Sequence, residues 1–408
     1  MSAADDITTD TPERPAPRRA ALFGFLVLHL LLIATGGVWA ALRIQQVEAE
    51  KQPPPFLAAP LTVELRYDVP EVISHEQLRE TLWKLRPRFR RPNPRTNHVD
   101  HALRFWGIES TFDDPECLSG VEMRELLLDH RQFAKAWEEG TPSLLMKTLY
   151  GVRARVASTA SASSHVDHTV TTLAEVGTPL DYPIVTEEGE TTFRAMLESA
   201  LNEFSLNQIE YEWSAMVFAL YAPTNREWLT QEGQAISFDR LADRIMRQEL
   251  TQGVCFGNHR LFALALMLQI DEQQPILSPE SRQRILSHLK QVTATLLEHQ
   301  HADGYWDHNW DGKPREGSAS DLPPIQRQIL ATGHALEWWA IAPREVHPPK
   351  ENLVRAGQWL HHTIAGLSMR EVDAYYTFLS HAGRALALWR GKFPAEVING
   401  SPSASTVE

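Results

Sequence analysis

The sequence predicts an all-α protein: an (α/α)6 toroid of about six helical hairpins, preceded by one transmembrane helix. Three observations support this prediction. They are an uncharged apolar segment near the N-terminus, five later segments that are apolar on nearly every face, and an amphipathic helix before most of them. A helix that is apolar all round is buried on several sides, and an amphipathic helix can cover it from outside.

Composition restricts the classes of partner. The chain has 408 residues and a formal net charge of −13, a length that accommodates one large domain or two ordinary ones. It contains no long basic run, and phosphate binding requires clustered Lys and Arg, so we expect no nucleic-acid partner. The two cysteines, Cys117 and Cys255, are too few for a disulfide-stapled fold, although one bridge remains an alternative in an exported domain.

The uncharged apolar segment Ala20–Leu42 is the predicted membrane anchor. At about 1.5 Å per residue, a helix of this length crosses a bilayer core of roughly 30 Å. Arg14, Arg18 and Arg19 lie just before it, so the positive-inside rule places residues 1–19 in the cytoplasm and the C-terminal domain outside, in the periplasm or cell envelope. The lipid bilayer is therefore an expected partner. A signal peptide cleaved near residues 38–40 is the alternative.

A spacer, the predicted toroid and a C-terminal tail follow the anchor. Residues 43–71 form a Pro-rich spacer, whose polyproline II stretch would hold the domain off the membrane. We expect the toroid at 72–393, with an insertion at about 158–190 whose β-branched residues and turn signals indicate a strand pair or an ordered loop. Residues 394–408 are rich in serine and small residues, which predicts disorder.

The toroid prediction rests on a repeated pattern of outer and inner helices. Apolar inner helices are expected within residues 97–110, 209–223, 257–270, 332–343 and 380–391. Charged outer helices are expected at 192–206, 238–250, 280–299 and 351–365, and residues 121–139 with the weaker segment 143–156 supply a further hairpin. About six hairpins can close into a ring without an exposed apolar end; an open helical-repeat array is the alternative.

The segment His299–Trp310, HQHADGYWDHNW, contains a motif that resembles a known family. Gln300, Gly304 and Trp306 match the Q-x3-G-x-W pattern of squalene and hopene cyclases, and related loops occur in protein prenyltransferases and other α/α-toroid proteins. The resemblance implies a structural loop, in which the glutamine satisfies a helix end, the glycine makes the turn and the tryptophan packs over it. The acidic D-x-D-D and D-D-x-x-D motifs of terpenoid enzymes are absent, so terpene cyclisation is not expected.

A second motif, GHALEW at residues 333–338, is similar to the G-H-x-x-E stretch of sugar 2-epimerases. Those enzymes also use a six-hairpin toroid and place this histidine in the sugar pocket. The resemblance implies that His334 acts as an acid or base and that Glu337 orients it or shares its protons.

Polar residues recur near the start of the inner segments. His101, His259, His334 and His381 take this position in four of them, and Glu212 does so in a fifth. If the inner helices are parallel, these residues gather at one mouth of the ring, near helix N-termini that favour a neutral imidazole. Such a set suits general acid–base chemistry or ligand binding. The alternative is that each histidine only hydrogen-bonds the turn below it.

Cys255 and His259 lie four residues apart and so share one helix face. Sulfur and imidazole together suit zinc, and His334 or His381 could be a third ligand. Protein prenyltransferases and lanthionine-forming cyclases, also toroids, hold zinc with such residues in the central cavity. The alternative is that Cys255 is a buried small apolar residue, and no cofactor is required by the sequence.

These observations leave three hypotheses about function. The first is an enzyme that acts on a saccharide-like polar substrate or glycan through His334, Glu337 and the other inner-helix histidines. In it, Trp306 would wall the pocket, and Asp303 and His101 would help to bind the ligand. The second is a non-catalytic binding or scaffold protein of the cell envelope, and the third is a zinc-dependent toroid enzyme. An open polar cavity would favour an enzyme, whereas a cavity filled by Trp and Leu would favour a scaffold.

Overall fold

The computed structural model describes residues 18–51, 54–314 and 321–399, which belong to two units, Met1–Gln52 and Pro53–Glu408. The first unit contains helix α1 (Arg18–Lys51), which continues beyond the predicted anchor boundary at Leu42. Within α1, the segment Leu22–Ile44 is long and apolar enough to cross a membrane, and none of it is buried by the rest of the protein.

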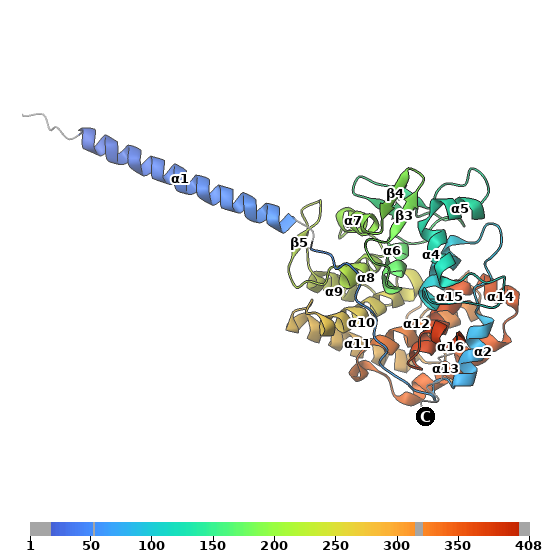
Figure 1. The fold of residues 1–408 in the computed structure, drawn as a ribbon. Coiled ribbons are helices and arrows are strands. Elements are labelled where there is room, and N and C mark those ends of the chain that lie inside the picture. Colours follow the sequence, from blue (N-terminus) through green and yellow to red (C-terminus); the bar gives the residue numbers. More distant parts are fainter. Residues whose placement is uncertain (1–17, 52–53, 315–320, 400–408) are drawn as a thin grey trace, which may run out of the picture. The chain divides into compact units, whose positions relative to one another are not determined.

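The second unit is mostly helical (Figure 1). Its α-helices are α2 (His75–Lys84), α3 (Thr96–Trp106), α4 (Gly120–Leu128), α5 (His130–Ala136), α6 (His168–Glu175), α7 (Arg194–Glu203), α8 (Glu212–Tyr221), α9 (Phe238–Met246), α10 (Asn258–Gln273), α11 (Pro279–His299), α12 (Pro324–Ile341), α13 (Lys350–Gly366), α14 (Met369–Ala374), α15 (Tyr376–Leu388) and α16 (Pro394–Ile398). Short 3-10 turns η1 (Val254–Gly257) and η3 (Arg344–Val346) precede α10 and α13.

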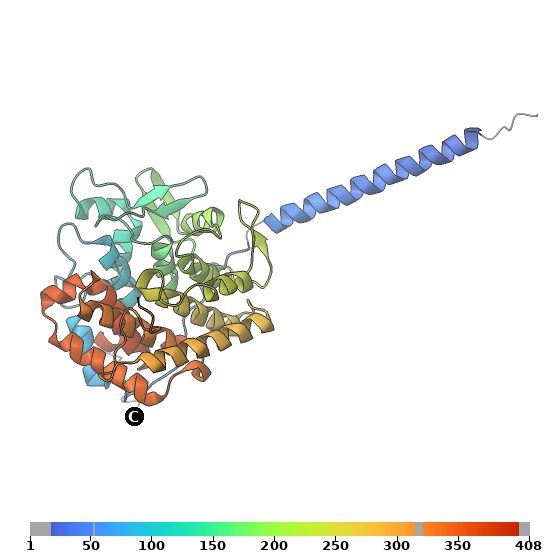
Figure 2. The same cartoon turned by 180° about the vertical axis from the view of Figure 1, so that it is seen from behind.

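Three antiparallel hairpins accompany the helices. They are β1–β2 (Leu145–Lys147 and Val152–Ala154), β3–β4 (Pro183–Thr186 and Gly189–Thr192) and β5–β6 (Trp228–Leu229 and Ala235–Ile236). The first two contact each other and lie with α5 and α7 at one end of the domain (Figures 1 and 2). The β3–β4 pair, which extends to Thr192, is a strand pair of the kind that was one of the two alternatives for residues 158–190.

Six helices, α3, α6, α8, α10, α12 and α15, are buried along most of their length and contribute many of the core residues. They pack in order: α3 on α6, α6 on α8, α8 on α10, α10 on α12, α12 on α15, and α15 on α3. The five predicted apolar helices are among them. Close backbone approach is part of this packing, since a Cβ at Gly333 of α12 would lie 2.9 Å from Cα of Ala382 on α15.

The other helices cover this core, as the long α11 does in the view from behind (Figure 2). Several begin at a side-chain cap that the sequence encodes. Ser74 and Gln77 form a capping box at the start of α2, and Ser119 and Glu122 form another at α4. Such reciprocal caps satisfy two N–H groups that a helix start leaves without partners.

Two sequence predictions about secondary structure were wrong. Residues 143–156 form the β1–β2 hairpin instead of a helix, because Gly151 turns the chain at a φ of 155° where a Cβ would lie only 2.0 Å from the Ala195 carbonyl oxygen. The region 158–190 is also more than an insertion, since it contains α6, the sixth buried helix. Its Thr-rich sequence, HTVTTLAE, has weak helix propensity, and packing on α3 and α8 stabilises it.

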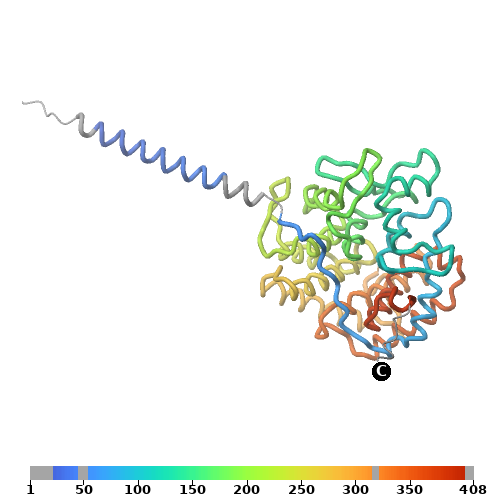
Figure 3. The backbone as a smooth tube through the Cα atoms, viewed as in Figure 1, coloured from blue at the N-terminus to red at the C-terminus, as the bar shows by residue number. Residues whose placement is uncertain are grey.

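The spacer prediction was wrong for residues 54–71. These residues run along the domain instead of standing away from it (Figure 3), and we call them the strap. The amide of Leu57 donates to the Tyr221 carbonyl at 2.7 Å, and that of Val69 donates to the Trp389 carbonyl at 2.8 Å. The Tyr67 hydroxyl donates to the Ala342 carbonyl at 2.6 Å. The strap is therefore part of the folded unit.

The C-terminal prediction was wrong at its start. Residues 394–398 form helix α16, whose Ala395 and Val397 are buried, and which packs on α2, α3 and α15. Pro394 begins the helix, a position that proline tolerates because its missing N–H would have no partner there. The remainder of the predicted tail, 400–408, lies outside the described residues.

Candidate functional site

The six buried helices each contribute one aromatic ring to a closed set, which we call the aromatic circuit. Neighbouring ring centroids are 3.9–5.4 Å apart, in the order His101 (α3), His168 (α6), Trp213 (α8), His259 (α10), His334 (α12), His381 (α15) and back to His101. All five imidazoles are at least 96% buried. The four histidines predicted to gather at one place therefore do so, joined by His168 and Trp213.

Hydrogen bonds assign the tautomers of most circuit histidines. Nδ1 of His101 donates to the Asn97 carbonyl and Nδ1 of His334 to the Leu330 carbonyl, both at 2.8 Å. A carbonyl can only accept, so in the neutral ring Nε2 keeps its lone pair. His334 Nε2 then accepts from His259 Nε2 at 3.0 Å, and the buried His259 Nδ1 has no partner among the described residues.

Burial keeps these rings neutral. It holds the pKa of His101, His259 and His334 well below the ordinary value, and neighbouring histidines lower it further. The pKa of His381 is also lowered by burial, although Glu337 opposes this. These four circuit histidines are thus uncharged and have lone pairs available, as metal binding and hydrogen-bond acceptance both require.

A strained loop places Cys255 beside the circuit. Cys255 and Phe256 both have left-handed backbone angles, with φ of 50° and 55°, between Gly253 and Gly257, which also have positive φ. Each such residue costs on the order of 1–3 kcal/mol, so the surroundings must hold the loop in place. The Trp310 indole does so by donating to the Phe256 carbonyl at 3.0 Å. Burial raises the pKa of the Cys255 thiol.

The donor atoms at this place fit a zinc ion. The Cys255 sulfur and one nitrogen each of His259 and His334 lie within 4.8 Å of one another. Two imidazole nitrogens on one tetrahedral zinc are about 3.3 Å apart, given bonds of about 2.0–2.1 Å, and His259 and His334 already approach to 3.0 Å. The Leu330 carbonyl would fix the His334 ring from behind, as outer partners of metal-bound histidines do.

Glu337 is the centre of a buried charge network. It accepts from Arg104 at 2.7 Å, from Arg384 at 2.6 Å and from His381 Nδ1 at 2.7 Å. Both arginines also pair with Glu175, which is equally buried. Burial alone would raise the pKa of Glu337, but Arg104, His381 and Arg384 together hold it well below the ordinary value. The network therefore contains two cations and two anions.

His168 is held by a second carboxylate, Asp100 of α3. His168 Nδ1 donates to Asp100 Oδ2 at 2.9 Å, and the Thr169 hydroxyl donates to the same oxygen at 2.7 Å. His168 Nε2 is buried and has no partner in the described part of the chain. Sequence reasoning missed this pair. The signal was a repeated tetrapeptide, HVDH, at residues 98–101 and 165–168, whose last histidines are the two stacked rings, His101 and His168.

A cavity of about 590 Å³ opens onto the circuit. Its walls are Asn97, His101, Ser164, His165, Gly253, Val254, Cys255, Phe256, Leu322, Leu330, Thr377, Phe378 and His381. The wall thus combines two circuit histidines and the cysteine with aromatic and small polar side chains, a composition typical of a small-molecule site.

Three predicted site residues lie elsewhere. Asp303 is at an exposed turn, 3.3 Å from His301, and contacts no part of the circuit. Trp306 is buried, with its indole donating to the Leu296 carbonyl at 2.7 Å, so it closes the end of α11 and does not wall the cavity. Glu212 is buried on α8, where burial raises its pKa, but its neighbour Trp213 occupies the circuit position.

The loop that carries Trp306 is a structural turn, in which Trp306 and not Gln300 satisfies the helix-end carbonyl of Leu296. The Gln300 amide donates to the carbonyls of Gly304 and Asn352, at 2.8 and 3.0 Å. Gly304 has a φ of 108°, and a Cβ there would lie 2.5 Å from the Arg355 carbonyl oxygen. The prediction of a structural turn is confirmed.

Cys117 and Cys255 are both free, so they do not form the bridge that the sequence left open.

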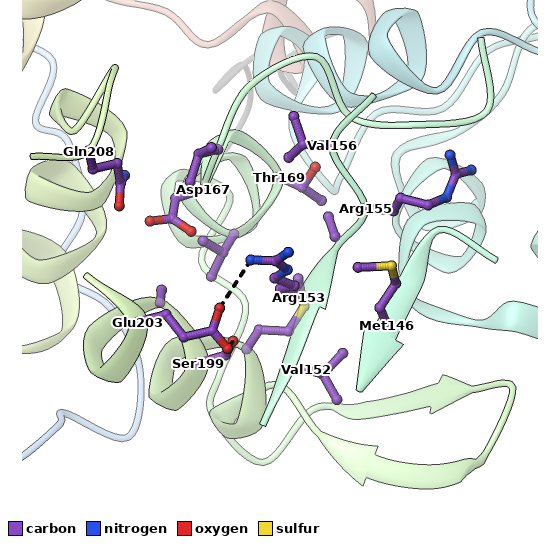
Figure 4. A pocket seen from close by; sticks show the side chains of 15 residues that line it. Met146, Val152, Arg153, Arg155, Val156, Asp167, Thr169, Ser199, Glu203 and Gln208 are labelled. Atoms are coloured by element: carbon purple, nitrogen blue, oxygen red, sulfur yellow. Dashed lines mark hydrogen bonds and ion pairs between the residues drawn. The ribbon is translucent and has the colours of Figure 1, made fainter. Parts of the chain in front are cut away.

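A smaller cavity of about 190 Å³ borders α6, α7 and β2 (Figure 4). Its charged groups have partners within the chain: Arg153 pairs with Glu203 at 3.1 Å, and the Ser214 hydroxyl donates to Asp167. Burial raises the pKa of Asp167 to about 6. Because its polar groups are satisfied internally, this cavity is a weaker candidate than the one on the circuit.

Comparison with protein-family models, with curated proteins and with solved structures found no match to this chain. The function must therefore be argued from the site itself.

Proposed function

We propose that residues 72–393 form an (α/α)6 toroid. The cyclic packing of the six buried helices supports this, as does the outer helix that precedes each of them: α2, α4 with α5, α7, α9, α11 and α13. The contact between α15 and α3 favours a closed ring over an open array, in which the first and last buried helices would be far apart. The aromatic circuit would then encircle the toroid axis.

The function that the site supports best is that of a zinc-dependent enzyme acting on a small polar molecule in the cavity. The observation that carries this proposal is the convergence of Cys255, which lines the cavity, with the buried His259 and His334 of the circuit. A bound zinc ion would supply Lewis-acid chemistry there. The His334–Glu337 acid–base pair is less favoured, because the hydrogen bonds of Glu337 among the described residues go to His381 and two arginines.

The place of action follows from α1. We propose that α1 is an uncleaved anchor with its N-terminus in the cytoplasm, so that the bilayer is a partner and the domain works outside the cytoplasm. The apolar segment Leu22–Ile44 supports an anchor, and the arginines before it support this orientation.

The test is the metal content of the full chain, purified in detergent without added metal. We expect close to one zinc per chain, and its loss in Cys255→Ser and His334→Gln. Cys117→Ser is the matched control, because Cys117 is the other free cysteine and is buried outside the site. Chelation should lower the unfolding free energy by about 4 kcal/mol if free zinc exceeds its dissociation constant a thousandfold. A wild-type chain without metal, or full zinc in Cys255→Ser, would refute the proposal.

A further inference from the structure

We propose that the cavity recognises an uncharged, hydroxyl-bearing ligand through the Nε2 atom of His381, and that Glu337, Arg104 and Arg384 are positioning residues that make this atom a hydrogen-bond acceptor. The inference deepens the proposed function and rests on it only for the reaction that follows binding. It assigns a ligand class to the cavity and a positioning role to the charge network around Glu337.

The orientation of the His381 proton follows from its two neighbours at Nδ1. Glu337 Oε2 lies 2.7 Å from this nitrogen, and Arg104 Nη1 lies 3.2 Å from it. The carboxylate is closer, and an ionised carboxylate can only accept, so Nδ1 carries the proton. Nε2 then presents a lone pair. This atom is buried and has no hydrogen-bond partner among the described residues, and the His381 side chain forms part of the cavity wall.

The charge network makes this orientation robust. Arg104 and Arg384 both donate to Oε1 of Glu337, which leaves Oε2 for His381. A protonated Glu337 could donate to Nδ1 and move the imidazole proton to Nε2, but two guanidinium groups favour the ionised form. Glu175 neutralises the second charge, so the network adds no net charge to the site. Burying two cations and two anions costs desolvation free energy, so we expect such a network where the position of the His381 proton matters.

The cavity wall indicates the ligand class. None of the described residues that line it is Lys, Arg, Asp or Glu. Both nearby arginines are held by carboxylates, so an anionic ligand would find no free guanidinium there in the part of the chain that the structure describes. Asn97 is in the same wall, and its Oδ1 is a second buried acceptor without a partner among the described residues. Two such acceptors in a wall that also contains Phe378 suit a ligand with hydroxyl donors and an apolar face.

The test is ring-nitrogen NMR of the full chain in detergent with 15N-labelled histidine. His381→Gln assigns the His381 signals, and zinc is measured on the same samples. We expect one neutral tautomer with the proton on Nδ1, and its loss in Glu337→Gln, since a carboxamide can also donate. Glu175→Gln is the matched control, because it binds the same two arginines without touching His381. Glycerol should shift the Nε2 signal of the wild type, and sulfate should not.

Each result decides between the alternatives. A proton on Nε2 in the wild type, an unchanged tautomer in Glu337→Gln, or a response to sulfate but not to glycerol would overturn the inference, as would the absence of any glycerol shift. Loss of zinc from His381→Gln would make His381 a metal ligand and would overturn it too. A wild-type chain that lacks zinc but shows the expected tautomer and glycerol shift would refute only the proposed metal chemistry.

Discussion

His347 lies away from the candidate site and allows a test of how burial changes the pKa of a histidine in this fold. Its Nε2 donates to the Trp339 carbonyl at 2.8 Å, and its ring packs on Tyr67 of the strap at 4.7 Å and on Trp389 at 5.3 Å. Burial lowers the pKa of His347 from 6.5 to about 4, against the opposing effect of its backbone hydrogen bonds. We expect His347→Gln, which keeps an N–H donor, to change the pH dependence of stability.

The sign and size follow from proton linkage. Below pH 6.5 the unfolded chain binds a proton at His347 that the folded chain does not, so stability falls as the pH drops from 6.5 towards 4. At 1.36 kcal/mol per pH unit, this loss is about 2 kcal/mol at pH 5 and reaches about 3 kcal/mol below pH 4. The variant lacks this loss. The difference in unfolding free energy between wild type and His347→Gln should therefore be about 2 kcal/mol smaller at pH 5 than at pH 8.

The assay is urea unfolding of the full chain in detergent, followed by tryptophan fluorescence, at pH 8, 6.5 and 5. Using the difference between the two proteins removes the contributions of other titrating groups, such as Asp167, whose raised pKa acts in the opposite direction. A difference that stays constant from pH 8 to pH 5 would show that His347 is not held neutral by burial.

Two further outcomes are expected. Gly333→Ala should destabilise the domain by about 1–3 kcal/mol, because its Cβ would press on Ala382 of α15, whereas Gly366→Ala, with open space around it, should be neutral or slightly stabilising. Equal thermal unfolding of these two variants would argue against close α12–α15 packing. For the anchor, a reporter active only outside the cytoplasm should work when fused after residue 399 and fail when fused before residue 1, and the reverse pattern would refute the orientation.

The apolar helices were predictable because a helix that is buried on all sides contains few polar residues. Segments such as 257–270 contain too few polar residues to face water, and their histidines stand out against that background. The same reasoning located four of the six circuit rings. It could not establish which nitrogen each histidine exposes, because that depends on partners such as Leu330 and Glu337, and the first of these acts through its backbone.

The parts that sequence reasoning missed share a physical cause. Helix α6 is built from threonine and valine, so local propensity favours a strand, and tertiary packing overrides it. Arg104, Arg384 and Glu175 are charged residues that would normally be assigned to the surface, and they are buried only because each meets opposite charges from other helices. Pairings across more than 70 residues leave no local pattern in the sequence.

The strap has a mechanical consequence. Its bonds to the core join the C-terminal ends of buried helices, at Tyr221 of α8 and beyond α12 and α15 at Ala342 and Trp389. Each of these lies eight residues after its circuit ring, about 12 Å along the helix. Tension that enters the domain through the chain at residue 54 would load the strap first. Under such tension the hydrogen bonds of the strap would break first, and the circuit histidines at the other end of the helices would keep their positions.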